Sequence, residues 1–395
     1  MRNELSDRER AIQFRLAGEA VGVICQRLNH SPRWFHKWWR RYLSEGPEGL
    51  YDLSHAPRTV IERIPPQLER LIVSVRRRLA AHATPDTRYQ RIGAPTVLAE
   101  LKALHLSPLP GLRTIERVLH CHGLTSPRVR FAAPINPDGY PAPVADDSNR
   151  LHQVDIVGPF YLKGKRQRWY IYVCKDVFDG AIYLKLCPSR RMDQVLAFLL
   201  EAWHALGLPA QVQFDNAREF VGWGKSARYL TRVIRLCLYL VVTPIFIPQR
   251  RPQRNGAVEN FNSWFQPLLF QRHFKHPGYL RRELVRLMDT ANQHHVQPRL
   301  GQRTIAHYRR GKRLRQLPAK LKLDLDHLPI TEGRVIFIRS VSARGRISLL
   351  GQTFPIGRRH KFTYVKVVLD TRRQRLTVYV AGKLFKRWPY KLSRH

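Results

Sequence analysis

The chain has 395 residues, 44% of them hydrophobic, so it is long enough for two or more packed domains and too apolar to be disordered as a whole. Its 69 Lys and Arg residues against 29 Asp and Glu residues give a formal net charge of +40. This excess indicates a polyanionic partner, with nucleic acid first and a ribosomal-type structural protein or a basic membrane-surface protein as alternatives. The first residues do not have the pattern of a signal peptide, and the longest apolar stretch is broken by Pro244. We therefore expect a cytoplasmic, nucleoid-associated protein without a membrane partner.

The first 60 residues predict three short helices. In "SPRWFHKWWRRYL", Ser31 and Pro32 are typical of a helix start. Aromatic residues at helical spacing then form one apolar face: Phe35, Trp38, Trp39 and Tyr42. Basic and histidine side chains fall on the other faces: Arg33, His36, Lys37 and Arg40. This pattern fits a helix-turn-helix whose last helix enters the major groove of DNA, and an ordinary three-helix bundle with a solvated charged face is the alternative.

A second helical module is expected over residues 61–124. It begins with a helical stripe of Leu68, Leu71, Ile72, Val75 and Leu79. Two more short helices follow, and the last one carries Arg113 and Arg117 as candidates for DNA contact. A tandem pair of such modules would lengthen the footprint on DNA. Five prolines between residues 125 and 148 then indicate an extended linker.

Residues 149–310 mix strand and helix patterns. Three β-branched and aromatic runs predict antiparallel strands, with Asp179-Gly180 as a hairpin turn between the second and third. A helix, a short strand, a helix, another strand and the helix opening at "NGAVENFNSWF" follow. This order predicts an α/β core with a mixed five-stranded sheet of the ribonuclease-H type, whose active site lies at strand ends.

Three carboxylates stand at notable positions in this core. Asp155 interrupts the apolar first strand, Asp215 ends the fourth, and Glu259 lies in the first turn of a helix whose buried side carries Val258 and Phe261. Each alone is often a turn former, a cap or a dipole partner. Together at one sheet end they would repel each other unless cations lay between them, and hard oxygen ligands suit Mg²⁺ or Mn²⁺. Two such ions can promote an in-line displacement at phosphorus.

Three segments of this core resemble the motifs of a known protein family. The segments "QVDIVGPF", "FDNAREF" and "PQRRPQRNGAVENFN" resemble the acidic motifs of the retroviral-integrase superfamily, in particular bacterial insertion-sequence transposases with a DDE core. The resemblance implies that Asp155, Asp215 and Glu259 are catalytic and bind two metal ions. It also implies phosphate contacts by the loop before the glutamate helix, through Arg250, Arg251, Arg254 and Asn255.

The sequence also departs from the family pattern. The spacing from Asp215 to Glu259 is longer than is common there, with the surplus placed in "VGWGKSARYL". Ala217 replaces a frequent glycine, Ser263 and Gln266 stand where integrases often have lysines, and Pro267 is expected to kink or end its helix.

The end of the chain is strongly basic. From Ile330 to His395 there are 16 Lys and Arg residues against 2 acids, and strand-like runs alternate with turns. We expect a small β-barrel that follows the DNA backbone, with a dimerisation domain as the alternative. The predicted domains are a helix-turn-helix domain at residues 1–60, a second such module at 61–124, a proline-rich linker at 125–148, an integrase-type core at 149–310, a basic linker at 311–329 and the barrel at 330–395.

The resemblance implies a DDE transposase, a metal-dependent polynucleotidyl transferase that cleaves at the 3′ ends of its mobile element and joins them to target DNA. Its partner is double-stranded DNA, and two ends require a dimer or larger assembly on DNA. A catalytically silent regulator of domesticated origin and a ribonuclease-H-like nuclease that only hydrolyses remain as alternatives.

Overall fold

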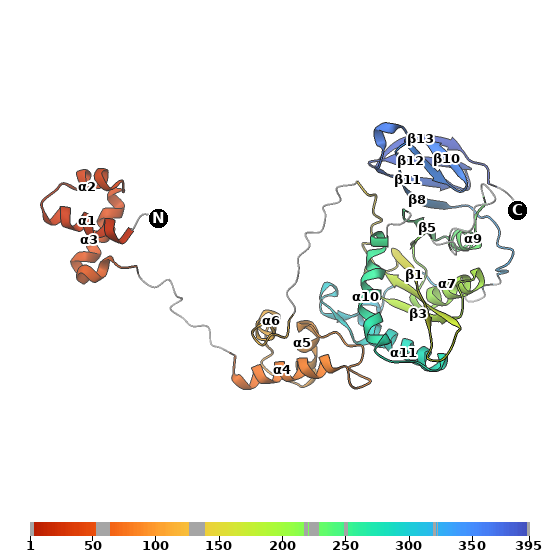
Figure 1. The fold of residues 1–395 in the computed structure, drawn as a ribbon, viewed down its shortest axis with the longest axis horizontal. Helices are drawn as coiled ribbons and strands as arrows, with labels where there is room; N and C mark the ends of the chain where they lie inside the picture. Colours follow the sequence, from red (N-terminus) through yellow and green to blue (C-terminus); the bar gives the residue numbers. More distant parts are fainter. Residues whose placement is uncertain are drawn as a thin grey trace. The chain divides into compact units, whose positions relative to one another are not determined.

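The computed structural model describes residues 4–52, 64–125, 139–216, 220, 229–248, 252–318, 321 and 323–392. The chain divides into two compact units, Met1–Ile64 and Pro65–His395, and each is described by itself (Figure 1). The predictions for the loop residues Arg250 and Arg251, for Ala217 and for most of "VGWGKSARYL" lie outside the described residues.

The first unit consists of α1 (Glu4–Leu16), α2 (Val21–Leu28), α3 (Pro32–Glu45) and the 3-10 turn η1 (Gly46–Leu50). As the sequence predicts, the hydroxyl of Ser31 caps α3 by accepting a hydrogen bond from the Trp34 amide at 3.2 Å. Ile24, Phe35 and Trp38 are buried between the helices. The aromatic stripe of α3 therefore forms the core of this unit, and its basic side chains remain on the outside.

The second unit begins with α4 (Pro66–Ala81), α5 (Ala94–Ala103) and α6 (Leu112–Cys121), which pack on one another. The loop between α4 and α5 docks this module onto the core. The Tyr89 hydroxyl donates to Glu283 at 2.6 Å, and Arg88 donates to the same carboxylate at 2.7 Å. His295 donates to the Tyr89 carbonyl at 2.8 Å. Tyr89 and Glu283 are fully buried, so this contact is an integral part of the unit.

The core contains one mixed sheet with the strand order β13-β12-β11-β8-β5-β4-β1-β2-β3. The first five strands are β1 (Leu151–Tyr161), β2 (Arg168–Asp176), β3 (Ile182–Cys187), β4 (Gln211–Phe214) and β5 (Thr243–Phe246). β1, β2 and β3 pair antiparallel, whereas β4 is parallel to β1 and to β5. This is the predicted ribonuclease-H-type arrangement, and the carboxyl ends of β1, β4 and β5 meet at one edge.

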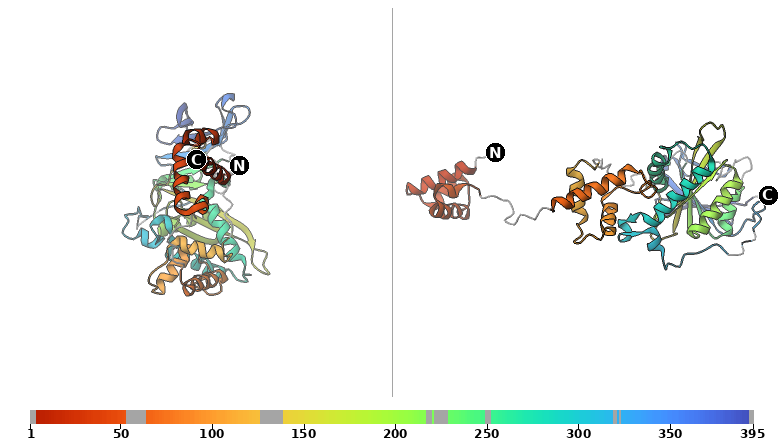
Figure 2. Two further views of the ribbon diagram at one scale, coloured as in Figure 1. Left: turned by 90° about the vertical axis from the view of Figure 1, so that its left-hand side faces the viewer. Right: turned by 90° about the horizontal axis from the view of Figure 1, so that it is seen from below.

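Helices cover both faces of these strands (Figure 2). α7 (Met192–Leu206) and α9 (Arg232–Tyr239) pack on one face with Tyr172 and Cys174 of β2. α10 (Gly256–Phe270) and α11 (Pro277–Asp289) pack on the other face with Ile171 and Val173. The alternation along β2 thus sends successive side chains into two separate cores. α10 continues for three residues beyond Pro267, so the helix does not end at this proline, and a kink there stays a prediction.

The segment after α11 contains short elements and then the C-terminal strands. The short elements are η3 (Thr290–His294), β6 (Val296–Gln297), η4 (Pro298–Leu300), β7 (Arg303–Thr304) and α12 (Ile305–Arg309). The strands are β8 (Arg334–Ser340), β9 (Arg346–Leu349), β10 (Gln352–Pro355), β11 (Tyr364–Asp370), β12 (Arg375–Val380) and β13 (Lys383–Pro389), with the turn η5 (Arg358–His360) between β10 and β11.

The expected separate C-terminal barrel is not what the structure shows. β8 pairs parallel with β5 through Ile245–Ile336 and Phe246–Phe337, so β8, β11, β12 and β13 extend the core sheet, and β9 and β10 form a separate hairpin. Phe246 and Phe337 stack with ring centroids 5.2 Å apart. The physical reason is that β5 would otherwise leave an apolar sheet edge with unpaired backbone groups.

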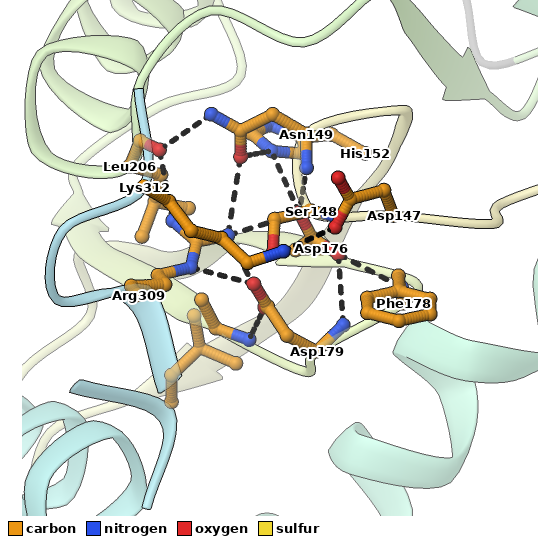
Figure 3. A network of polar contacts seen from close by, with 12 residues as sticks. Asp147, Ser148, Asn149, His152, Asp176, Phe178, Asp179, Leu206, Arg309 and Lys312 are labelled. Carbon is orange, nitrogen blue, oxygen red and sulfur yellow. Dashed lines mark hydrogen bonds and ion pairs between the residues drawn. The ribbon is translucent and has the colours of Figure 1, made fainter. Parts of the chain in front are cut away.

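A buried polar network ties α12 to the amino end of β1 (Figure 3). Arg309 donates to Asp176 at 2.9 Å and to Asp179 at 2.6 Å, and it also reaches the side chain of Asn149. Asp176 further accepts the Asn149 amide and lies 3.6 Å from His152. The single arginine thus compensates two fully buried carboxylates.

Within the described residues no helix is both long and apolar enough to cross a membrane.

Candidate active site at the carboxyl ends of the central strands

Asp155 lies on β1 where the strand leaves the buried part of the sheet. Its side chain is half-buried, and the Asn262 amide on α10 donates a hydrogen bond to it at 2.6 Å. Burial raises the pKa of the Asp155 carboxyl, although this hydrogen bond and the positive charge of Arg190 act in the opposite direction. Ionisation of Asp155 is therefore less favourable than ionisation of an exposed aspartate, and a bound cation would favour it.

Asp215 directly follows Phe214, the last residue of β4. β1 and β4 run parallel, with Gln153 paired to Gln213. Continuing this register by two residues predicts Asp215 beside Asp155, which is the fifth of the eleven residues of β1. The next residue, Asn216, donates its side-chain amide to the carbonyl of Ile247, which follows β5. The chain after β4 is thus fixed to the neighbouring strand.

Glu259 lies in the first turn of α10. Burial raises the pKa of its carboxyl, and the negative charge of Asp155 raises it further. Two carboxylates from segments about a hundred residues apart in sequence are therefore close enough to repel each other. On the same helix Val258, Phe261 and Phe265 are buried, as predicted.

Two buried amide side chains of the sheet hold α10 in place. The Gln153 Oε1 atom accepts hydrogen bonds from the amides of Ala257 and Val258, both at 3.0 Å, so it caps the start of the helix. Gln213 donates to the carbonyl of Arg254 at 2.9 Å and to the side chain of Asn255 at 3.2 Å. These contacts satisfy helix-terminal groups and fix the distance between Glu259 and β1.

Asn255 was predicted to contact a DNA phosphate, and its position in the structure contradicts this. It is only 3% exposed, and its side-chain amide donates to the Val154 carbonyl at 3.2 Å. A buried amide that is bonded to the sheet on both sides cannot also reach a DNA phosphate, so Asn255 positions α10. The guanidinium of Arg254 packs over the rings of Tyr140 at 4.2 Å and Tyr364 at 5.4 Å.

Sequence reasoning missed Gln153 and Asn262. Asn262 follows Glu259 by three residues and so shares its side of the helix, which is a signal that could have been used. Gln153 is a polar residue in a strand, two positions before Asp155, and its side chain lies on the same side of the sheet. Nothing in the local sequence connects Gln153 to a helix start about a hundred residues later.

The donor atoms near Asp155 determine which metal ion would fit this site. In the described part of the chain, no three side chains of the types His, Cys, Asp and Glu are arranged as a ready metal-binding group. Asp155 and Glu259 do interact, and Asp215 follows in register, so the available donors are carboxylate oxygens. Such donors fit Mg²⁺ or Mn²⁺ rather than the softer transition metals. The repulsion between Asp155 and Glu259 is the kind of charge arrangement that a divalent cation relieves.

The other predicted DNA-binding residues are exposed. On α3 these are Arg33, His36, Lys37 and Arg40, and on α6 they are Arg113 and Arg117. Lys37 lies over the ring of Trp38 at 4.6 Å, with its charged head group at the surface of the unit. Exposure leaves these side chains accessible to a phosphate backbone, and their role in DNA binding stays a prediction.

A basic groove lies on the sheet extension made by the C-terminal strands, which are coloured blue in Figure 1. It encloses about 640 Å³, and its basic lining consists of Arg334, Lys366, Arg373, Arg375 and Arg387, against the single acid Asp370. Alternate residues of β11, such as Tyr364 and Lys366, face it because strand side chains alternate. A cationic groove over a sheet is suited to a polyanion.

Residues 7–58 match the model of a helix-turn-helix domain, which confirms that prediction for the first unit. Among solved structures, the chain is similar to the HTLV-2 integrase catalytic core domain in complex with magnesium, at 19% identity and a TM-score of 0.33, over 41% of this chain and 97% of that one. It is similar to a simian T-cell lymphotropic virus intasome in complex with a PP2A regulatory subunit, at 18% identity and a TM-score of 0.36, over 75% and 97%. The BIV integrase catalytic core domain matches at 18% identity and a TM-score of 0.31, over 40% and 93%. At similarities of this size, the fold assignment depends on the strand order described above.

Proposed function

We propose that this protein is a DNA transposase, which binds the ends of its mobile element, cleaves at their 3′ ends and joins them to target DNA by transesterification. The observation that carries the proposal is the proximity of Asp155 on β1 and Glu259 on α10, near the carboxyl end of β4. Burial raises the pKa of both carboxyls there, and the charge of Asp155 raises the pKa of Glu259 further. Perturbed carboxyls at such a strand edge are typical of a catalytic site rather than of a structural one.

Asp155, Asp215 and Glu259 would hold two Mg²⁺ or Mn²⁺ ions in this proposal. Bound ions of this kind lower the pKa of an attacking oxygen and stabilise the leaving oxygen at a phosphodiester. The chain's own contribution is positioning. Asn262 orients Asp155, and Gln153 keeps the glutamate helix against the sheet.

The remaining residues hold the DNA. The exposed basic face of α3 would contact an element end, as the match to a helix-turn-helix domain suggests. The C-terminal groove with Lys366 and Arg375 would follow a phosphate backbone. Because two ends must be joined in one reaction, the active species would be a dimer or larger assembly on DNA.

A strand-transfer assay tests this proposal. The substrates are the two DNA segments that flank the coding region, with a supercoiled plasmid as the target and Mg²⁺ or Mn²⁺ in the buffer. The variants Asp155→Asn, Asp215→Asn and Glu259→Gln are expected to lose joining while they retain DNA binding. The matched control is Asp193→Asn, which neutralises an exposed aspartate at the start of α7.

The outcomes separate the alternatives. If the wild-type protein joins no 3′ end but cuts the substrate, it is a nuclease that only hydrolyses. If it binds the flanking DNA and neither cuts nor joins it, it is a DNA-binding regulator. If the three carboxylate variants stay as active as the Asp193→Asn control, the assigned active site is wrong.

A further inference from the structure

A second pocket lies where the loop between α4 and α5 meets α10. It encloses about 490 Å³, and its lining includes His82, Gln90, Arg91, Lys175, Phe261 and Trp264. On α10 the lining residues Phe261 and Trp264 project from a different side of the helix than Glu259 does. The pocket is therefore separate from the carboxylate site, and its size falls in the range of small-ligand sites.

The pocket carries an excess of positive charge. The head groups of Arg299 and Lys175 both lie close to Gly180. If Gly180 carried a Cβ atom, this atom would be 2.9 Å from the Arg299 guanidinium and 3.8 Å from the Lys175 ammonium. Burial, together with the charges of Arg91 and Arg299, lowers the pKa of Lys175 to about 8. Asp176 and Asp179 act in the opposite direction, but both are already paired with Arg309.

The side chains of Lys175 and Arg299 make no hydrogen bond and no ion pair with another residue in the described part of the chain. The neighbouring His295 is affected in the same way, because burial and then the charge of Arg91 lower its pKa to about 3. His295 is therefore neutral and adds no charge of its own. Cations gathered in this way without a paired carboxylate are unfavourable by themselves and favour the binding of an anion.

The other side of the pocket is aromatic and contains an unsatisfied acceptor. The Lys175 ammonium lies 5.1 Å from the Phe261 ring centroid, and the Arg91 guanidinium lies 6.0 Å from that of Trp264. The Oε1 atom of Gln90 is buried and has no hydrogen-bond partner within the described residues. A buried carbonyl oxygen of this kind requires a donor such as an amino group. Anion, flat ring and amino donor occur together in a nucleotide.

We propose that this pocket binds one nucleotide, with its phosphate at Lys175 and Arg91, its base against Trp264 and a base amino group at Gln90. The nucleotide can be free or can be an unpaired residue of a DNA strand, since both present the same phosphate and base. The proposal does not depend on the carboxylate site, so the failure of one leaves the other untouched.

Isothermal titration calorimetry of the full chain with dAMP, inorganic phosphate and deoxyadenosine tests the proposal. We expect Lys175→Met to weaken dAMP binding by roughly 10- to 100-fold, as is usual when a charge-assisted hydrogen bond is lost. Trp264→Leu is expected to weaken dAMP binding and leave phosphate binding unchanged. Lys163→Met removes an exposed lysine of the same unit and is expected to change nothing. Circular dichroism spectra check that each variant is folded.

The pH dependence gives an independent measurement. Lys175 is protonated below about pH 8, so the affinity of the wild-type protein for dAMP is expected to fall between pH 7 and pH 9. In Lys175→Met this pH dependence should be lost. A short single-stranded (dA) oligonucleotide distinguishes the two sources: if Lys175→Met weakens its binding as well, the pocket accepts a nucleotide within a strand, and if only dAMP is affected, the ligand is a free nucleotide.

Three results would overturn the proposal. The first is that the wild-type protein does not bind dAMP. The second is that Lys175→Met and Lys163→Met weaken dAMP binding equally, which would indicate a non-specific charge effect. The third is that inorganic phosphate binds as tightly as dAMP, which would exclude a contact with the base.

Discussion

Replacing Gln153 by leucine would remove the acceptor that caps α10 without changing the size of the side chain much. Gln153 is 6% exposed, and its Oε1 atom accepts from the Ala257 and Val258 amides at 3.0 Å each. In Gln153→Leu both backbone amides would lose their partner at the buried start of the helix.

The size of the effect follows from these two bonds. A buried donor left without a partner costs about 1–3 kcal/mol, so the pair gives roughly 2–4 kcal/mol once partial relaxation of the helix start is allowed for. For a unit of this size, the Tm falls by about 1.5–2 °C for each kcal/mol lost from the free energy of unfolding, which predicts a fall in Tm of roughly 3–8 °C. Glu259 lies in the same turn, and a displacement of about 1 Å can slow a reaction on the order of 100-fold.

Differential scanning calorimetry and the strand-transfer assay measure the two effects, the latter well below the Tm of the variant. The matched control is Gln271→Leu, the same substitution at an exposed position just after α10. If Gln153→Leu melts together with the control and joins DNA at the wild-type rate, the capping contact does not position the helix and the reasoning is refuted.

Three other variants test separate parts of the molecule. Burial raises the pKa of Glu283, but hydrogen bonds from Tyr89 and from arginines lower this pKa overall. The ionised Glu283 therefore stabilises the folded protein above the ordinary pKa of a glutamate, and this stabilisation is lost as the pH falls. Urea unfolding should therefore show a smaller loss of stability below about pH 5 for Glu283→Gln than for the wild-type protein, and parallel curves would contradict this. Arg309→Met leaves two buried carboxylates uncompensated and should cost about 3–5 kcal/mol in urea unfolding, whereas the exposed Arg310→Met should be neutral. Arg33→Ala should reduce the slope of log K against log salt for DNA binding by about 0.9, and an unchanged slope would place Arg33 away from phosphate.

The sequence by itself determined the local elements. Ser31 and Pro32 fixed the start of α3, the aromatic spacing fixed its buried face, and the apolar runs fixed the five central strands, because these patterns depend on neighbours a few residues apart. Asp155 and Glu259 could be selected in advance for a similar reason: each is a charged residue beside an apolar pattern that otherwise continues.

Only the tertiary structure decided how distant segments meet. Asn255 was expected to contact DNA, but it is buried against the carbonyl of Val154. The C-terminal strands were expected to form a separate barrel, but β8 completes the apolar edge of β5. The pairing of Gln153 with the start of α10 likewise joins residues about a hundred positions apart. Such contacts depend on which buried backbone groups and apolar edges still lack a partner after the elements have formed, and a local sequence pattern carries no information about that.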